Sequence, residues 1–248
     1  MIKLTIDNKE VEVEEGTSIL NAAHKVGIKI PTLCHHPAIV PYSACRVCIV
    51  ELKKKSWSDL VTSCSRHVEN NMIIETKSEK VISARRLVIE FILARASSSP
   101  EIIALAKEYG IEKPRFTIQE EKCILCGLCV RVCSELINVS AIGFSNRGVH
   151  REASTPFCKQ SETCIGCGAC VNVCPTNAIV MQKNGDDVIF DKWKTLVKLV
   201  KCKMCDNKFS SLMQLNIVKQ KVNLTNEILD ICPDCRRKTT VINVTSIT

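Results

Sequence analysis

The chain has 248 residues, of which 46% are hydrophobic and 17 are cysteines. That hydrophobic content is enough to build buried cores, so a disordered or fibrous chain is excluded, and the length allows one large domain or two to three small ones. The formal net charge of +8 counts every cysteine as neutral. A site of four thiolates around zinc or an oxidised iron–sulfur core has a net charge of about −2. Four such sites would therefore cancel the excess of basic residues. The basic balance therefore does not by itself indicate a nucleic-acid partner.

The first residues, Met1–Asp7, contain neither the basic region nor the apolar region of a signal peptide. The apolar stretch Leu87–Ala96 is interrupted by Glu90 and Arg95, so no membrane insertion is expected. An odd number of cysteines argues against complete disulfide pairing and favours thiolates that bind metal in a reducing compartment. We expect a cytoplasmic protein.

In the N-terminal module the sequence places a hairpin first, then a helix, then further strands, and this order predicts a β-grasp ferredoxin of the α+β class. Alternating apolar residues on both sides of the turn at Asp7–Lys9 predict a β-hairpin. Thr17 or Ser18 caps a following helix, which Gly27 ends. Three later segments are expected to be strands: Val47–Leu52, Asp59–Cys64 and Met72–Glu75.

Two helices are predicted to connect this module to the rest. Apolar residues at helical spacing from Ser78 to Ala96 predict the first, with Arg85 and Arg86 on its polar side. The second begins at Pro100 and ends at Gly110. The expected domains are a β-grasp [2Fe–2S] domain, a helical connector, a two-[4Fe–4S] ferredoxin domain and a C-terminal zinc module, at residues 1–77, 78–115, 116–187 and 188–248.

The strongest motif is a cysteine pattern that repeats after 41 residues, from Cys123 to Cys164. In each copy three cysteines spaced two residues apart wrap one corner of a cubane, and a fourth ligates the other cluster. This pattern assigns one [4Fe–4S] cluster to Cys123, Cys126, Cys129 and Cys174, and the other to Cys133, Cys164, Cys167 and Cys170. Two zinc sites are the alternative.

A separate group near the N-terminus, Cys34-x10-Cys45-x2-Cys48-x15-Cys64, supplies the four thiolates of a [2Fe–2S] cluster, most of them from one loop. Zinc is again the alternative. Here the sequence resembles a known family: residues 30–37, 44–51 and 85–90 look like the iron–sulfur subunit of NADH dehydrogenases and the matching region of NAD-linked [FeFe] hydrogenases. The resemblance covers roughly residues 1–185.

The chain departs from that family in two respects. Residues 91–121 contain neither His nor Cys, so the additional [4Fe–4S] cluster that members usually hold there is not expected. The large hydrogenase domain is not present before the end at Thr248, so the chain is not expected to be a hydrogenase by itself.

The last cysteine group, Cys202-x2-Cys205 with Cys232-x2-Cys235, has the two-knuckle spacing of a structural zinc site. A rubredoxin-like mononuclear iron is the runner-up, because Pro233 gives the second knuckle the Cys-Pro-x-Cys form, although Arg236 stands where rubredoxins have Gly. A redox-active disulfide is a third alternative. Cys158 belongs to no group and is interpreted as a spare thiol.

The resemblance implies a non-catalytic electron-transfer subunit of a flavin-dependent NAD(P)H oxidoreductase, of the electron-bifurcating transhydrogenase or hydrogenase type, in an anaerobe. Its partners would be flavin- and NAD(P)-binding subunits and a soluble ferredoxin, since no nucleotide-binding motif is visible on this chain. The alternatives are an iron–sulfur subunit of a formate- or succinate-type dehydrogenase, or a zinc-dependent regulatory or nucleic-acid-binding module.

Overall fold

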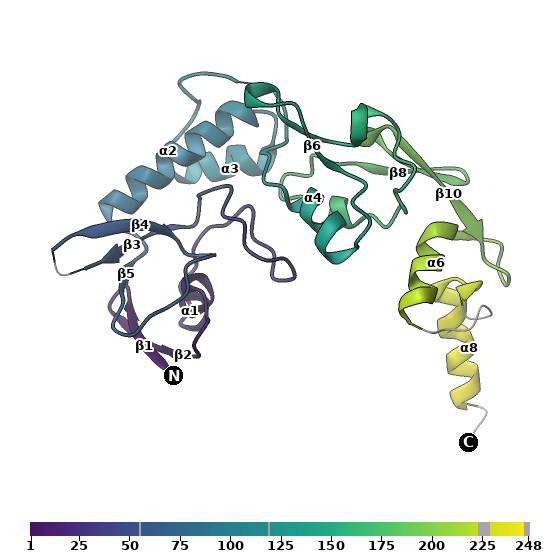
Figure 1. The fold of residues 1–248 in the computed structure, drawn as a ribbon, viewed down its shortest axis with the longest axis horizontal. Helices are drawn as coiled ribbons and strands as arrows, with labels where there is room; N and C mark the ends of the chain where they lie inside the picture. Colours follow the sequence, from purple (N-terminus) through teal and green to yellow (C-terminus); the bar gives the residue numbers. More distant parts are fainter. Residues whose placement is uncertain (55, 119, 223–228, 246–248) are drawn as a thin grey trace. The chain divides into compact units, whose positions relative to one another are not determined.

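The computed structural model describes residues 1–54, 56–118, 120–222 and 229–245, with side chains described up to residue 239. The chain forms two compact units, each described by itself below: Met1–Leu136 with Val173–Ala178, and Ile137–Asn172 with Ile179–Thr248. Figure 1 colours the elements in chain order. Residues 223–228 and 246–248 of the predicted C-terminal module lie outside the described part of the chain.

The first unit begins with a five-stranded sheet in the order β2-β1-β5-β3-β4. β1 and β5 are parallel, and the other neighbouring strands are antiparallel. The predicted hairpin and the three later strands are confirmed, with small shifts at their ends. The strands are β1 (Ile2–Ile6), β2 (Lys9–Val13), β3 (Ile49–Lys53), β4 (Ser58–Thr62) and β5 (Ile73–Glu75).

Helix α1 (Ile19–Lys25) follows the hairpin. Its N-cap is Ser18, whose hydroxyl accepts a hydrogen bond from the Asn21 N–H at 3.2 Å. Gly27 follows the helix with φ 76°, a left-handed conformation that costs glycine little. The helix and the sheet share one core of alternating strand residues and helix residues, whose large, deeply buried members include Ile6, Ile19, Leu20, Val50 and Ile74.

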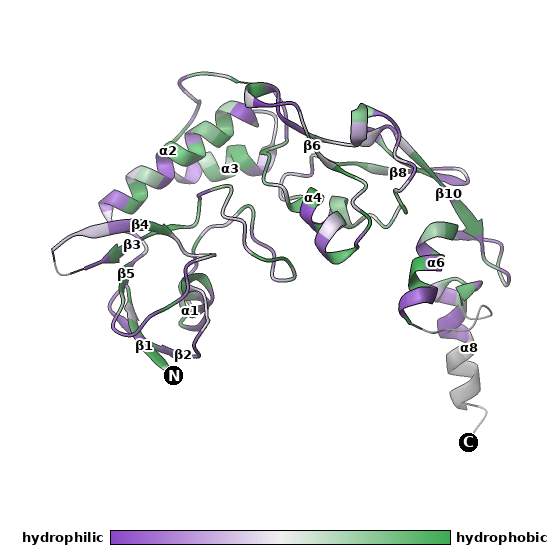
Figure 2. Cartoon of the chain, viewed as in Figure 1, coloured by the Kyte–Doolittle hydropathy of each residue, from purple (hydrophilic) through white to green (hydrophobic). Residues whose placement is uncertain are grey.

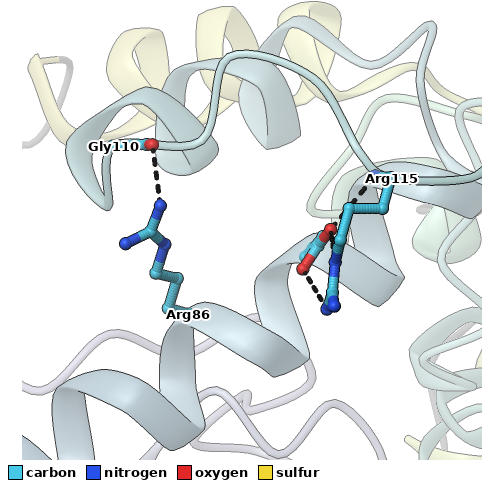
Figure 3. Close-up of polar contacts among 4 residues, drawn as sticks. Arg86, Gly110 and Arg115 are labelled. Carbon is cyan, nitrogen blue, oxygen red and sulfur yellow. Dashed lines mark hydrogen bonds and ion pairs between the residues drawn. The ribbon is translucent and has the colours of Figure 1, made fainter.

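Two connecting helices follow, α2 (Glu79–Arg95) and α3 (Pro100–Glu108), and confirm the predicted pair. Ser78 and Ser99 cap them through their hydroxyls. Figure 3 shows how α2 holds the segment after α3: Arg86 donates to the Gly110 carbonyl at 3.4 Å, and Arg115 donates to both carboxylate oxygens of Glu90 at 2.6 and 2.8 Å.

The predicted faces of α2 are partly wrong, although apolar and polar residues alternate along it as expected (Figure 2). Arg85, expected on the polar side, is only 4% exposed. Its two terminal nitrogens donate to the carbonyls of Ile49 (2.5 Å) and Thr76 (3.4 Å) and to the Tyr109 hydroxyl (3.2 Å). These bonds offset part of the cost of burying the guanidinium, whose Nε is buried without a hydrogen-bond partner among the described residues. Three apolar residues of the helix instead remain 45–49% exposed: Ile82, Leu87 and Phe91.

The first unit ends with α4 (Leu128–Arg131), which continues as the π-helix η1 (Val132–Leu136). The second unit holds a two-stranded sheet, β6 with β7, and a four-stranded sheet in the order β11-β10-β9-β8. Within the described ranges no helix is both long and apolar enough to span a membrane. The elements of the second unit are β6 (Gly143–Ser145), η2 (Gly148–His150), β7 (Glu152–Ser154), η3 (Pro156–Cys158), α5 (Ala169–Asn172), β8 (Met181–Asn184), β9 (Asp187–Phe190), η4 (Asp191–Trp193), β10 (Thr195–Lys201), β11 (Lys208–Ser211), α6 (Leu212–Lys221) and α8 (Pro233–Thr245).

Candidate metal centres

The N-terminal cysteine group lies around one end of the β3–β4 hairpin. Cys34, Cys45 and Cys48 come from the long loop that leads into β3, and Cys64 follows β4. All four side chains are buried, with 1–9% of each residue exposed. The structure therefore brings together residues that are up to 30 positions apart in the sequence, and their role as cluster ligands stays a prediction.

These four thiols contact one another as two pairs. A hydrogen bond from the Cys34 thiol to the Cys45 sulfur raises the pKa of Cys34 and lowers the pKa of Cys45 to about 6. The thiol of Cys48 donates in the same way to Cys64, which raises the pKa of Cys48 and lowers the pKa of Cys64 to about 6. A [2Fe–2S] core takes two protein ligands on each iron, so two adjacent pairs of sulfurs fit that core.

Backbone and side-chain donors approach the same sulfurs. The Cys45 N–H donates to the Cys34 sulfur at 3.4 Å, and the Ser43 hydroxyl lies 3.4 Å from the Cys64 sulfur. Ser43 was missed by the sequence analysis. No local pattern marks it, because the contact joins residues 21 positions apart and depends on the fold of the loop.

The first predicted [4Fe–4S] group lies within the first unit. The pKa of Cys126 is raised to about 12, mainly by burial and to a smaller extent by the nearby thiols of Cys123, Cys174 and Cys45. The Cys174 sulfur accepts a hydrogen bond from the Ala178 N–H at 3.3 Å. Cys126 also packs against the hydrophobic cluster that contains Cys34 and Cys45. Two predicted centres are therefore neighbours.

The second predicted [4Fe–4S] group draws on both units. Cys164, Cys167 and Cys170 belong to the second unit, on and before α5, whereas Cys133 belongs to η1 of the first. This ligand set therefore remains a prediction from spacing. Gly166 shows why its loop needs glycine: its φ is 72°, and a Cβ there would lie 3.0 Å from the Cγ1 of Val197.

The C-terminal group forms a compact four-sulfur site. The four sulfurs all lie within 4.8 Å of one another, and the sulfurs of Cys205 and Cys232 are 3.7 Å apart. Two thiolates bound to a single tetrahedral ion at about 2.3 Å lie about 3.8 Å apart, so the spacing fits one ion. Three of the four cysteines are buried and Cys205 is exposed: Cys202, Cys232 and Cys235 are 0%, 4% and 7% exposed.

Backbone N–H groups favour the thiolate form at this site. Burial acts to raise the pKa of Cys202. Hydrogen bonds outweigh this effect and lower the pKa to about 6, among them those from the N–H groups of Cys232 and Met204, which lie 3.2 and 3.4 Å from the sulfur. A hydrogen bond to Cys205 and burial raise the pKa of Cys235 to about 12. The donor set is therefore that of a thiolate site for a single metal ion, without an indication of which metal.

Cys158 lies outside these groups and is exposed. The Ser154 hydroxyl donates to its sulfur at 3.4 Å, and its own thiol contacts the Glu152 carboxylate at 3.8 Å.

Comparison with known families identifies the cluster domains. Residues 1–79 match the 2Fe-2S iron-sulfur cluster binding domain, and residues 116–181 and 163–207 each match a 4Fe-4S dicluster domain. The last match extends through Cys202 and Cys205. The chain is therefore an iron–sulfur protein with a [2Fe–2S] domain followed by [4Fe–4S] dicluster sequence.

Curated relatives share this region. The chain is 31% identical to an NADH-quinone oxidoreductase subunit of Rickettsia bellii over 180 aligned positions, which cover 62% of this chain and 26% of the relative. It is 32% identical to the NADPH-Fe(3+) oxidoreductase subunit alpha of Geobacter sulfurreducens, in a match that covers 60% of this chain and 20% of the relative. It is also 32% identical to the NADP-reducing hydrogenase subunit HndD of Solidesulfovibrio fructosivorans, with 60% of this chain and 30% of the relative covered. The chain thus spans a third or less of the length of these relatives.

Among solved structures, a chain of an NAD+-reducing [NiFe]-hydrogenase in the H2-reduced state is similar, with a TM-score of 0.54 and 25% identity. The match covers 62% of this chain and 74% of the hydrogenase chain.

Proposed function

We propose that this chain, which is homologous to iron–sulfur electron-transfer subunits of NADH and NADPH oxidoreductases and hydrogenases, relays single electrons between a flavin-bearing subunit and a second redox partner. When bound, the clusters each exchange one electron, which links a two-electron flavin to one-electron carriers. The observation that carries this proposal is the proximity of Cys45 and Cys126, which belong to two different cluster groups.

In this proposal the cysteines act only as ligands. Cys34, Cys45, Cys48 and Cys64 hold the [2Fe–2S] cluster, and the pairing of their sulfurs supports this assignment. One [4Fe–4S] cluster is held by Cys123, Cys126, Cys129 and Cys174, and the other by Cys133, Cys164, Cys167 and Cys170. The domain division at residues 77, 115 and 187 belongs to the same proposal.

The proposed partners are flavin- and NAD(P)-binding subunits of one complex, with ferredoxin as a further acceptor, in a bifurcating transhydrogenase or hydrogenase in the cytoplasm of an anaerobe. Residues 16–50 contain no Asp or Glu, and they include Lys25, Lys29 and Arg46. Within this run Val40 and Tyr42 are 72% and 55% exposed, on the loop that carries three of the [2Fe–2S] cysteines. This supports docking of an acidic partner surface beside the cluster.

For the C-terminal group we propose a structural zinc ion bound by Cys202, Cys205, Cys232 and Cys235. The spacing of the sulfurs supports a single ion rather than a cubane, whose sulfur ligands bind four separate irons. Mononuclear iron is the second candidate, because the same four thiolates would bind it.

The test is to purify the full chain anaerobically, confirm cluster loading, and assay NADH and NADPH oxidation with a viologen dye as acceptor. We expect reduction by dithionite but no turnover with either nucleotide until a flavin-bearing subunit is added. Robust turnover by the chain alone would contradict the carrier role, because it would require a flavin or nucleotide site on this chain.

A further inference from the structure

Three hydroxyl groups from two separate segments meet at Cys64. Ser43 belongs to the loop before β3, Thr62 ends β4, and Ser65 follows Cys64. The Ser43 Oγ lies 2.6 Å from the Ser65 Oγ and 3.4 Å from both the Thr62 Oγ1 and the Cys64 Sγ, and the Thr62 and Ser65 oxygens are 2.9 Å apart. Cys64 and Thr62 are buried, with 2% and 7% of each residue exposed, whereas Ser43 is half-buried and Ser65 is exposed. The network therefore runs from the protein surface to the buried sulfur.

The backbone of Ser43 is unusual in a way that serves this contact. Its φ is 57°, in the left-handed region that residues with a Cβ rarely adopt. Such conformations persist where the surrounding structure holds them, and they concentrate at functional sites. Arg46 of the same loop is also left-handed, with φ 58°, and Ser43 is the one of the two whose hydroxyl reaches the Cys64 sulfur.

Each hydroxyl has one hydrogen to donate, which allows two arrangements. In a closed ring, Ser43 donates to Ser65, Ser65 to Thr62, and Thr62 to Ser43. In an open chain, Ser65 donates to Thr62, Thr62 to Ser43, and Ser43 to the Cys64 sulfur. To pass from the ring to the open chain, the Ser43 hydroxyl rotates from Ser65 to the Cys64 sulfur and gives up its 2.6 Å hydrogen bond to Ser65, while no proton leaves its oxygen.

We propose that Ser43 is a positioning residue that sets the reduction potential of the [2Fe–2S] site by donating its hydroxyl hydrogen to the Cys64 sulfur. This rests on the proposed function, in which Cys64 is a cluster ligand. One added electron makes the ligand sulfurs more negative, so the open chain is favoured in the reduced state. A donor that interacts more strongly with the reduced form raises the potential. The same contact contributes to the lowered pKa of Cys64.

The experiment is an EPR-monitored redox titration of the full chain, with dithionite as reductant. Ser43→Ala removes the hydroxyl and keeps the backbone strain, whereas Ser43→Gly removes both. We expect both variants to lower the equilibrium constant for one-electron reduction of the [2Fe–2S] site by about tenfold, or about 59 mV. If strain rather than the hydroxyl set the potential, Ser43→Ala would match the unchanged protein and only Ser43→Gly would differ, which would overturn the proposal.

Two control variants sharpen the result. Ser65→Ala removes the competing acceptor and leaves the Ser43 hydroxyl free for the sulfur, so the potential should stay the same or rise. Ser56→Ala changes an exposed serine at the other end of the β3–β4 hairpin and should have no effect.

Cluster assembly is followed separately by iron content and absorption, so the two proposals can fail independently. If the unchanged chain assembles no [2Fe–2S] cluster, the proposed ligand set is wrong, and the role of Ser43 falls with it. If the cluster assembles and both Ser43 variants change the constant by less than about twofold, only the tuning role is overturned. If the Ser43 variants fail to assemble the cluster, Thr62→Val tests the same chain of hydrogen bonds, because it removes the hydroxyl that donates to Ser43. It is expected to lower the constant by a smaller factor, and an unchanged constant would overturn the proposal.

Discussion

At the scale of single residues, Arg85 shows how a charged group can belong to a protein core. Its guanidinium joins the start of β3, the link between β5 and α2, and the end of α3 through bonds to Ile49, Thr76 and Tyr109. Hydrogen bonds from its two terminal nitrogens offset much of the cost of burying this cation, and removing the side chain leaves buried carbonyl oxygens without a partner. One side chain therefore connects the sheet to the helical connector.

We predict that Arg85→Leu destabilises the first unit by about 2–4 kcal/mol, because a network of buried hydrogen bonds is lost. The neighbouring Arg86→Leu is the matched control: Arg86 is exposed and makes one long bond to Gly110, so its loss should cost about 0.5 kcal/mol or less. Thermal unfolding of both variants, followed by circular dichroism, measures the difference. Equal melting temperatures would contradict the structural role of Arg85.

Glu90 provides a pH-dependent contact. Hydrogen bonds from the side chain and backbone N–H of Arg115 lower the pKa of Glu90 below its usual 4.5. A carboxylate whose pKa is lower in the folded state stabilises the fold above pH 4.5, and this contribution is lost as the pH falls through the folded-state value.

We therefore expect the difference in melting temperature between the unchanged chain and Glu90→Gln to be constant near neutral pH and to shrink below about pH 4.5. Glu112→Gln, an exposed carboxylate on the following segment, is the control. A difference that does not depend on pH would show that the Glu90 carboxylate does not titrate against Arg115.

At the scale of elements, the C-terminal cysteine knuckles form a site that fits a single metal ion. Cys202 and Cys205 follow β10, and Cys232 and Cys235 lie at the start of α8, so one ion would link a strand to a helix. Among the described residues, the partly buried apolar side chains that pack against these cysteines are Phe209 and Ile231. In small modules of this kind, metal binding supplies the folding free energy.

We predict that Cys232→Ser lowers the stability or solubility of the C-terminal module and abolishes stoichiometric zinc, while the EPR signals of the reduced clusters persist. Cys158→Ser makes the same replacement at a thiol outside the ligand groups and should leave zinc unchanged. A red chromophore with a high-spin ferric signal that disappears in Cys232→Ser would instead establish mononuclear iron.

At the scale of the whole molecule, the ligand groups predict the metal content. One [2Fe–2S], two [4Fe–4S] and one single-ion site give about ten iron, ten sulfide and one zinc per chain after anaerobic reconstitution. Elemental analysis and sulfide determination measure this directly. Iron near two per chain would contradict both cubane assignments.

The sequence by itself determined the features that depend on neighbours along the chain. The hairpin, the cap of α1 at Thr17 or Ser18, and the cysteine spacing are local, because turn chemistry, capping and loop ligation act over a few residues. The cluster types and the relationship to oxidoreductase subunits followed from these patterns, and the family matches agree with them.

Only the tertiary structure decided which residues meet across the chain. The pairing of Cys34 with Cys45 and of Cys48 with Cys64, the proximity of Cys126 to Cys45, and the hydroxyl of Ser43 on Cys64 all join distant segments. Helical periodicity misplaced Arg85 because it ranks a residue by its own polarity. Burial depends instead on whether distant carbonyl and hydroxyl groups satisfy the side chain, and those partners are brought together only by packing.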